Sequence, residues 1–333
     1  MSQPVEGLRT RHGEGALELC GEEAAALGSR ALVISSNHPE PQETAALETM
    51  ARVLRRARVG NHPFPQVPRP GIALGRCVEM AAEAARESRC RLIMGLGEGD
   101  TLNAAREAAG RTLLPCLLLP TSVGYGEPRG SHQRPLPEIL IVDPRLALGS
   151  ASARTAVQGL ELFAALLEPY AAGPPDEVQD LLPSALRLLV DSLPAAVNEP
   201  KNPSHRSGLA EATATAARVL SLVESRFPPI KELLYRLVPD GPVGEGVLAG
   251  MIPAILAAGS EDKGPFPRSR VAQLGRQILG VREDDDGRAA SWAAGGIRQW
   301  MVNLGLQPTL TGAPAARARA DEQLRAVLSG ALR

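Results

Sequence analysis

The segment from Leu92 to Arg106, LIMGLGEGDTLNAAR, constrains the fold of this 333-residue chain more than any other part of its sequence. A short apolar run leads into a glycine-rich turn, and the turn opens a helical pattern. Small residues let the backbone approach a bound group, and the first N–H groups of a helix point toward an anion. The pattern is therefore typical of a phosphate-binding turn. Glu98 and Asp100, however, put two carboxylates where a phosphate would lie.

Short apolar runs alternate with helical patterns through the first half of the chain. Strands are predicted at Ala31–Ser35, Arg91–Met94, Pro115–Leu119 and Ile139–Val142. Helices are predicted between them, at Glu43–Arg58, Gly71–Arg86 and Asn103–Ala109. Short apolar strands separated by helices predict βαβ units and a parallel sheet covered on both faces. Such sheets bind ligands at the carboxyl ends of their strands, where the loops at residues 36–37, 97–100 and 121–127 would meet.

The second half of the chain shows a different pattern, because no strand is predicted beyond about residue 150. Helical patterns follow one another there, separated by links rich in proline and glycine. They cover Thr155–Tyr170, Val178–Ala196, Ser207–Glu224, Ile230–Leu237, Gly244–Ala258, Arg268–Leu279, Ala289–Leu304 and Ala315–Leu332. We therefore expect an α/β nucleotide-binding-type domain with a parallel sheet over residues 1–150, followed by an all-helical domain over residues 151–333.

Composition narrows the choice of partners and location. The formal net charge is −1, and no block of like charge indicates a nucleic acid or an anionic membrane as partner. No apolar run is long enough for a transmembrane helix, and the N-terminus has no apolar core of signal-peptide length. The four cysteines show no CxxC spacing, which favours reduced thiols. We expect a cytoplasmic protein with a small-molecule substrate.

Five sequence blocks, taken in order, resemble motifs of the iron-containing alcohol dehydrogenases, the maleylacetate reductases and the dehydroquinate synthase-like proteins. Arg11–Leu17 (RHGEGAL) is similar to FGxGAL, and Leu96–Arg106 falls on the GGGSxxDxAK loop. Leu119–Glu127 (LPTSVGYGE) resembles PTTxGTGSE, and Pro137–Leu148 (PEILIVDPRLAL) resembles PDVAIVDPELTL. Gly159–Tyr170 (GLELFAALLEPY) falls on GxDALxHAIEAY. The IVDP block and its distance to the GLEL helix are the most specific part of this resemblance.

The resemblance implies a dehydroquinate synthase-like fold with NAD or NADP bound in a cleft between the domains. The cofactor passes a hydride to or from an alcohol or carbonyl. The segment Ala31–Asn37 lacks the acidic residue that many alcohol dehydrogenases place after this strand, which makes the chain more similar to the maleylacetate reductases. Family members pair through their N-terminal strand, so a homodimer or a pair with a homologous subunit is expected. The cofactor-binding residues implied in this way are Ser36, Gly97, Glu98, Gly99, Asp100, Asn103, Thr121, Ser122 and Gly124.

Most residues that bind the metal in the family have no counterpart in this chain. Many members hold a divalent metal with an aspartate and three histidines; here the acidic ligand aligns with Glu161 and the first histidine with Ala165. No histidine lies after His205, and the best match to the last ligand is Asp240 or a neighbour of Glu245. Oxygen ligands alone suit Mg²⁺ or Ca²⁺ better than zinc or ferrous iron. The sequence thus predicts a degenerate site at Glu161 and Asp240, and we expect it to hold no metal.

The cofactor turn leaves two alternatives open. A carboxylate about 4 Å from a pyrophosphate oxygen costs roughly 1 kcal/mol in water-like surroundings, so binding of NAD(P) would be weak. Alternatively, Asp100 is the N-cap of the following helix, and the turn binds no cofactor. The cleft is also less well covered, since only Pro128–Leu136 stands in place of a longer hairpin of the family.

Three residues are candidates for the catalytic acid: His62, His132 and Tyr125. Histidine commonly transfers protons near neutral pH, although a loop histidine can equally be a solvated surface residue and Tyr125 a cleft wall. We predict an NAD(P)-dependent oxidoreductase that acts on an alcohol or carbonyl without the usual histidine-bound metal. The alternative is a catalytically degenerate pseudoenzyme that serves as a binding or scaffolding subunit.

Overall fold

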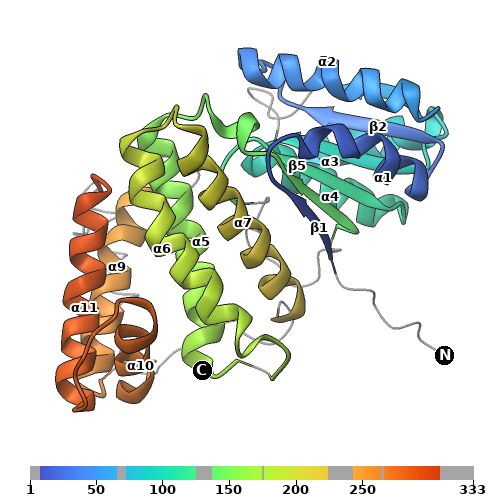
Figure 1. The fold of residues 1–333 in the computed structure, drawn as a ribbon. Helices are drawn as coiled ribbons and strands as arrows, with labels where there is room; N and C mark the ends of the chain where they lie inside the picture. The colour runs from blue at the N-terminus through green and yellow to red at the C-terminus, as the bar shows by residue number, and fades with distance from the viewer. Residues whose placement is uncertain are drawn as a thin grey trace. The chain divides into compact units, whose positions relative to one another are not determined.

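The computed structural model describes residues 8–65, 73–124, 137–174, 176–223, 243–263 and 266–307 (Figure 1). The chain divides into two compact units. The first, here called the sheet unit, comprises Met1–Ala151 and Glu199–Ser221. The second, the helical unit, comprises Ser152–Asn198 and Leu222–Arg333.

The sheet unit is built on a six-stranded sheet with the order β1-β6-β5-β4-β2-β3, in which every neighbouring pair is parallel. Its strands are β1 (Arg9–His12), β2 (Arg30–Ser35), β3 (Gly60–Phe64), β4 (Leu92–Gly97), β5 (Cys116–Pro120) and β6 (Ile139–Val142). The predicted parallel sheet is confirmed. The apolar runs correspond to β2, β4, β5 and β6, whereas β1 and β3 were missed because these edge strands carry mostly exposed polar residues.

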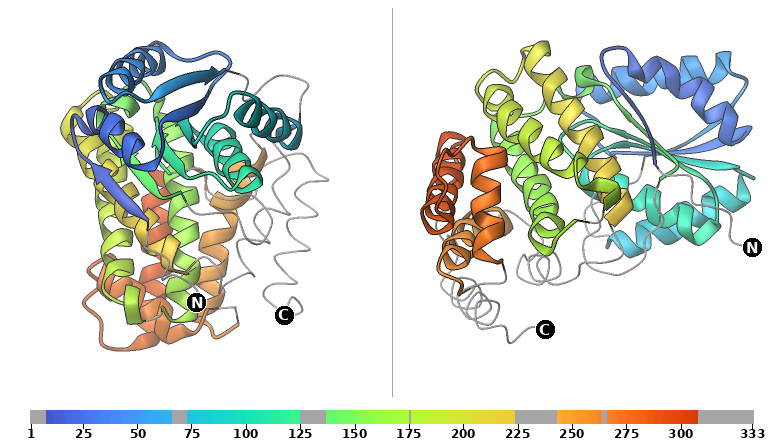
Figure 2. Two further views of the ribbon diagram at one scale, coloured as in Figure 1. Left: turned by 90° about the vertical axis from the view of Figure 1, so that its right-hand side faces the viewer. Right: turned by 60° about the horizontal axis from the view of Figure 1, so that its bottom comes forward.

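Helices cover both faces of this sheet (Figures 1 and 2). One face buries Val33, Met94 and Leu117 in a cluster with residues of α1 and α2. On the opposite face a Cβ atom at Gly95 would lie 2.7 Å from the Cβ of Ala105 in α4, so glycine permits this close approach of the helix. The helical elements of this unit are η1 (Ala16–Leu19), α1 (Cys20–Leu27), α2 (Pro41–Arg56), α3 (Leu74–Glu87), α4 (Gly99–Thr112), η2 (Pro144–Ala147) and most of α7 (Pro203–Val223).

The described residues of the helical unit form helices and no strand. They make up α5 (Ser152–Ala172), η3 (Asp176–Val178), α6 (Leu181–Asn198), α9 (Val243–Ser260), α10 (Arg268–Ile278) and α11 (Asp286–Asn303). Trp300 lies in the core, with its ring centroid 5.2 Å from that of Phe163 and its indole N–H donating to the carbonyl of Val190 at 3.0 Å. The helices predicted at Ile230–Leu237 and Ala315–Leu332 lie outside the described residues.

In the part of the chain that the structure describes, no helix has both the length and the apolar character needed to cross a membrane.

Candidate functional site

The chain reverses its direction of travel across the sheet between β2 and β4. From β2 it passes to β3 on one side, and from β4 it passes to β5 on the other. Open parallel sheets bind ligands in the crevice at such a switch point, outside the carboxyl ends of the strands. Ser35 is paired with Leu96, so Ser36 and the turn that begins at Gly97 follow the two neighbouring strands directly. The structure therefore brings these two groups of predicted cofactor-binding residues to one edge.

The turn after β4 has an open backbone. Gly99 adopts φ +43°, and a Cβ atom built on it would meet nothing within 4 Å. Gly97 adopts φ +148°, a conformation that favours glycine, and a Cβ atom there would lie 3.0 Å from Thr101 Cγ2. Helix α4 begins at Gly99, and the first N–H groups of a helix have no acceptor within it. Backbone donors and an uncovered glycine thus face the switch point together.

The hypothesis that Asp100 is the N-cap of this helix is wrong. Glu98 occupies the N-cap position, with Thr101 N–H donating to its carbonyl at 2.9 Å, and Asp100 is the second helical residue. The error arose because the helix starts at the glycine rather than at Asn103. Among the described residues, the half-buried carboxylate of Asp100 makes no hydrogen bond or ion pair. It remains at the positive end of the helix dipole, which favours a negative charge there.

Asn103 lies one turn further along α4 and is 1% exposed. Its Oδ1 atom has no hydrogen-bond partner in the described part of the chain. A buried acceptor without a donor costs about 1–3 kcal/mol, which a ligand hydroxyl or a water would recover. This orphaned acceptor, the open Gly99 and the helix N-terminus fit a nucleotide cofactor, whereas the two carboxylates oppose its phosphates.

Thr121 follows β5 at the same edge, and its hydroxyl is already engaged. It donates to Glu43 Oε1 at 2.9 Å, and both residues are buried. The backbone N–H of Thr121 also donates to the carbonyl of Gly97 at 2.9 Å. Glu43 in turn closes a capping box with Glu40, whose N–H donates to Glu43 Oε2 at 3.1 Å. Sequence reasoning missed Glu43, although the spacing of the two glutamates beside Pro41 is the signal for such a cap.

Ser122 is also buried, and it borders a small hollow between the ends of β5 and β6 and helix α7. The hollow measures about 10 Å³, which is room for roughly one water molecule. Arg206 of α7 also lines it and is 1% exposed; it donates to the carbonyls of Pro200 and Ser150, each at 2.9 Å. Burial lowers the pKa of Arg206, and these acceptors fix α7 to the sheet unit. Gly124 closes the described part of this loop with φ +88°.

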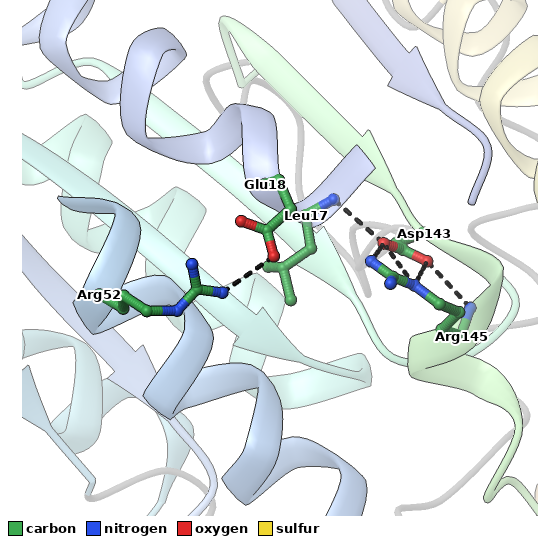
Figure 3. Close-up of polar contacts among 5 residues, drawn as sticks. All are labelled: Leu17, Glu18, Arg52, Asp143 and Arg145. Atoms are coloured by element: carbon green, nitrogen blue, oxygen red, sulfur yellow. Dashed lines mark hydrogen bonds and ion pairs between the residues drawn. The ribbon is translucent and has the colours of Figure 1, made fainter. Parts of the chain in front are cut away.

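The IVDP block has a structural explanation (Figure 3). The side chain of Asp143 is fully buried; its Oδ2 accepts from Leu17 N–H at 3.1 Å and from Arg145 Nη2 at 2.7 Å. Its Oδ1 accepts from the backbone N–H of Arg145 at 3.0 Å. Asp143 therefore fastens η1, from the RHGEGAL block, to the end of β6. An exposed ion pair between Glu18 and Arg52, 2.9 Å long, lies beside it.

The predicted catalytic residues are not brought together by the described residues. His62 lies on β3 opposite Leu32, three residues before the carboxyl end of β2, or roughly 10 Å along the strand. Its ring Nε2 is 3.2 Å from the hydroxyl of Ser88. Tyr125 and His132 lie outside the described residues. His38, which sequence reasoning did not consider, lies in the loop after β2, with its N–H donating to Ser36 Oγ at 3.2 Å.

The predicted metal ligands likewise form no site in the described residues. Glu161 is a half-buried residue of α5, and the position one turn further on holds the buried Ala165, which offers no ligand atom. Asp240 is not among the described residues, and of Glu245 the structure describes only the backbone, in α9. No group of three or more histidine, cysteine, aspartate or glutamate side chains is suited to a metal within those residues. Of the predicted ligands only Glu161 has a described side chain, so the degenerate metal site stays a prediction.

Comparison with known proteins finds relatives among the same classes of enzyme that the sequence motifs resemble. No protein-family model matches the chain. A maleylacetate reductase from Sphingobium indicum is 26% identical over 214 residues, which is 60% of this chain and 58% of that protein. The aligned region thus spans little more than half the length of this relative.

Solved structures share the fold over almost the whole chain. An archaeal halo-thermophilic alcohol dehydrogenase from a Red Sea brine pool superposes with a TM-score of 0.81 at 18% identity, covering 100% of this chain and 94% of that one. The NADH-dependent butanol dehydrogenase A of Thermotoga maritima has a TM-score of 0.75 at 15% identity, covering 98% and 91%. The predicted fold class is confirmed. The chain is a divergent relative, at low identity, of the iron-containing alcohol dehydrogenase and maleylacetate reductase superfamily.

Proposed function

We propose that the chain is an NAD(P)-dependent oxidoreductase that acts on an alcohol or carbonyl without a histidine-bound metal. The observation that carries this proposal is the turn from Gly97 to Asp100 at the switch point of the sheet, with Gly99 uncovered at the start of α4. The names of its relatives, a maleylacetate reductase and an NADH-dependent butanol dehydrogenase, support the same reaction class.

The residues of the edge have separable tasks. Backbone N–H groups at the start of α4 would bind a phosphate, and Asn103 Oδ1 would accept a hydrogen bond from a hydroxyl group of the cofactor. A bound nicotinamide would supply or accept the hydride. Glu98 and Asp100 would repel the phosphates, at a cost of about 1 kcal/mol per close carboxylate in water-like surroundings. Binding is therefore expected to be weaker than at a turn with uncharged residues.

A pseudoenzyme is the second candidate, and one observation favours it. His62, the one predicted acid among the described residues, bonds Ser88 instead of lying at the carboxyl edge. In that case the fold would serve as a binding or scaffolding subunit, alone or beside a homologous subunit.

Titration with NADH and NADPH, followed by cofactor fluorescence, separates these candidates. We expect weak binding by the wild type and about fivefold tighter binding by Asp100→Ser, as removal of a repulsion of about 1 kcal/mol requires. Asp191→Ser, an exposed aspartate of α6, is the matched control and should leave affinity unchanged. Hydride transfer with short alcohols and aldehydes is then measured on the saturated protein.

The results of the NADH titration and of the turnover assay distinguish the two candidate functions. Binding with turnover supports the oxidoreductase, and binding without turnover across such a substrate panel supports the pseudoenzyme. If only the double variant Glu98→Gly/Asp100→Ser bound NADH, the dehydrogenase proposal would be refuted.

We also propose a cytoplasmic location, which is supported by four buried cysteines that form no disulfide.

A further inference from the structure

A polar pocket of about 340 Å³ lies within the helical unit, and none of the predicted site residues lines it. Its walls come from α6, α10 and the segment between α5 and α6, and the end of α5 contributes Tyr170. The volume is within the range of small-molecule sites, but the lining is polar where such sites are mostly apolar. The pocket is therefore suited to a hydrophilic ligand.

The polar side chains come from α10, from α6 and from the residues just before α6. Arg187 lies in α6 and Asp180 directly before its first residue, whereas Arg270, Gln273 and Gln277 follow at intervals of three and four in α10. Such spacings place side chains on one face of a helix. One wall of the pocket is thus a row of polar side chains on α10, and α6 adds Arg187.

Hydrogen bonds orient both glutamine amides. Tyr170 is 2% exposed, and burial raises the pKa of its phenol, which stays protonated and donates to Gln277 Oε1 at 2.8 Å. Arg270 Nη1 donates to Gln273 Oε1 at 3.0 Å. Each amide oxygen is thereby occupied, so each NH₂ group is left as a donor. The wall formed by α10 therefore offers donors to a ligand.

The two guanidinium groups reinforce this donor surface. Arg187 Nε donates to the backbone carbonyl of Gln277 at 2.9 Å, and Nη2 donates to the same carbonyl; both bonds hold the side chain against α10 and leave Nη1 unused. Within the described residues, neither Arg187 nor Arg270 forms an ion pair with a carboxylate. Asp176 and Asp180, exposed members of the lining, offer carboxylate oxygens to hydroxyl groups.

We propose that this pocket binds a small polyhydroxylated anion. A carboxylate or phosphate group of the ligand is held by Arg187 and Arg270, because guanidinium groups bind such anions through paired charge-assisted hydrogen bonds. Hydroxyl groups of the ligand bond the two glutamine amides and the two aspartates. The site is independent of the cofactor-binding edge and goes beyond the proposed oxidoreductase function.

Isothermal titration calorimetry tests the proposal with glucose 6-phosphate and gluconate as probes, and with glucose and inorganic phosphate as controls. We expect one or both probes to bind, and Arg270→Gln and Arg187→Gln each to weaken binding about tenfold or more. Arg298→Gln, an exposed arginine of α11 outside the pocket, should have no effect. Comparison of the two probes identifies the anionic group as phosphate or carboxylate.

Several results would overturn the proposal. These are no binding by either probe at millimolar concentration, equal affinity for inorganic phosphate and glucose 6-phosphate, or binding that both arginine variants retain. Circular dichroism establishes that the variants fold. NADH titration of Arg270→Gln keeps this test separate from the proposed function, because the variant should bind NADH like the wild type.

Discussion

Two ion pairs in Figure 3 have similar lengths but opposite burial, and we predict very different contributions to stability. Asp143 bonds Arg145 at 2.7 Å with its own side chain fully buried, and it also accepts from Leu17 N–H. Glu18 bonds Arg52 at 2.9 Å, but the two side chains are 46% and 43% exposed. Hydrogen bonds to a buried charge contribute about 1.5–3 kcal/mol, whereas exposed ion pairs contribute about 0–1 kcal/mol.

The perturbation is Asp143→Asn, with Glu18→Gln as the matched control. The asparagine NH₂ group would face either Leu17 N–H or the Arg145 guanidinium, donor against donor. Arg145 is 43% exposed and can turn toward water, so the loss stays near the lower end of that range, at about 1.5–2 kcal/mol of unfolding free energy. Glu18→Gln should cost less than about 0.5 kcal/mol.

Urea unfolding followed by far-ultraviolet circular dichroism measures both variants. Hydrogen exchange of peptides covering residues 9–19 and 139–148 locates the change. Both tryptophans, Trp292 and Trp300, belong to the helical unit, so their fluorescence is a poor reporter of the sheet unit. Equal losses for the two variants, or a loss below about 1 kcal/mol for Asp143→Asn, would refute the assignment of Asp143 as a buried clamp.

Two further predictions concern buried groups of the sheet unit. Thr121→Val leaves Oε1 of the buried Glu43 without its donor and should cost about 1–3 kcal/mol in urea unfolding, whereas Thr44→Val, at an exposed site, should cost under about 0.5 kcal/mol; equal costs would contradict the role of the buried bond. Burial, with a smaller contribution from the Glu18 charge, raises the pKa of Cys20 from 9.0 to about 12, so the unfolded chain ionises first and stability should fall as pH rises from 9 to 12. Unfolding free energies of wild type and Cys20→Ala across this range check the second prediction, and identical pH profiles would show that Cys20 does not contribute.

The central strands could be predicted from the sequence because burial on both faces makes them apolar without interruption. The expected bounds of β6 match the structure, and those of β2, β4 and β5 differ by one to three residues. The edge strands β1 (RTRH) and β3 (GNHPF) carry no such signal. Their backbones are held by a neighbouring strand, and that tertiary contact leaves little trace in the local sequence.

Some features of the candidate sites could likewise be predicted from the sequence, and others could not. The glycine turn could be recognised because backbone geometry imposes its residue types over a few positions. The bond from Thr121 to Glu43 joins residues 78 positions apart, and the bond from Tyr170 to Gln277 joins residues 107 apart. No local pattern records such pairs, which is why the pocket of the helical unit could not be predicted. The start of α4 was misplaced because glycine was assigned to the turn rather than to the first helical position.

Helix α7 shows that the sheet unit is not a separable module. Its residues follow 47 positions of the helical unit along the chain, yet Arg206 bonds the carbonyl of Ser150 within the sheet unit. During synthesis the sheet unit can therefore be completed only after residues 199–221 have left the ribosome, when residues 152–198 of the helical unit have already been made. A fragment cut at residue 151 would lack the helix that borders the ends of β5 and β6. Exchange of either unit between relatives would consequently require three junctions rather than one.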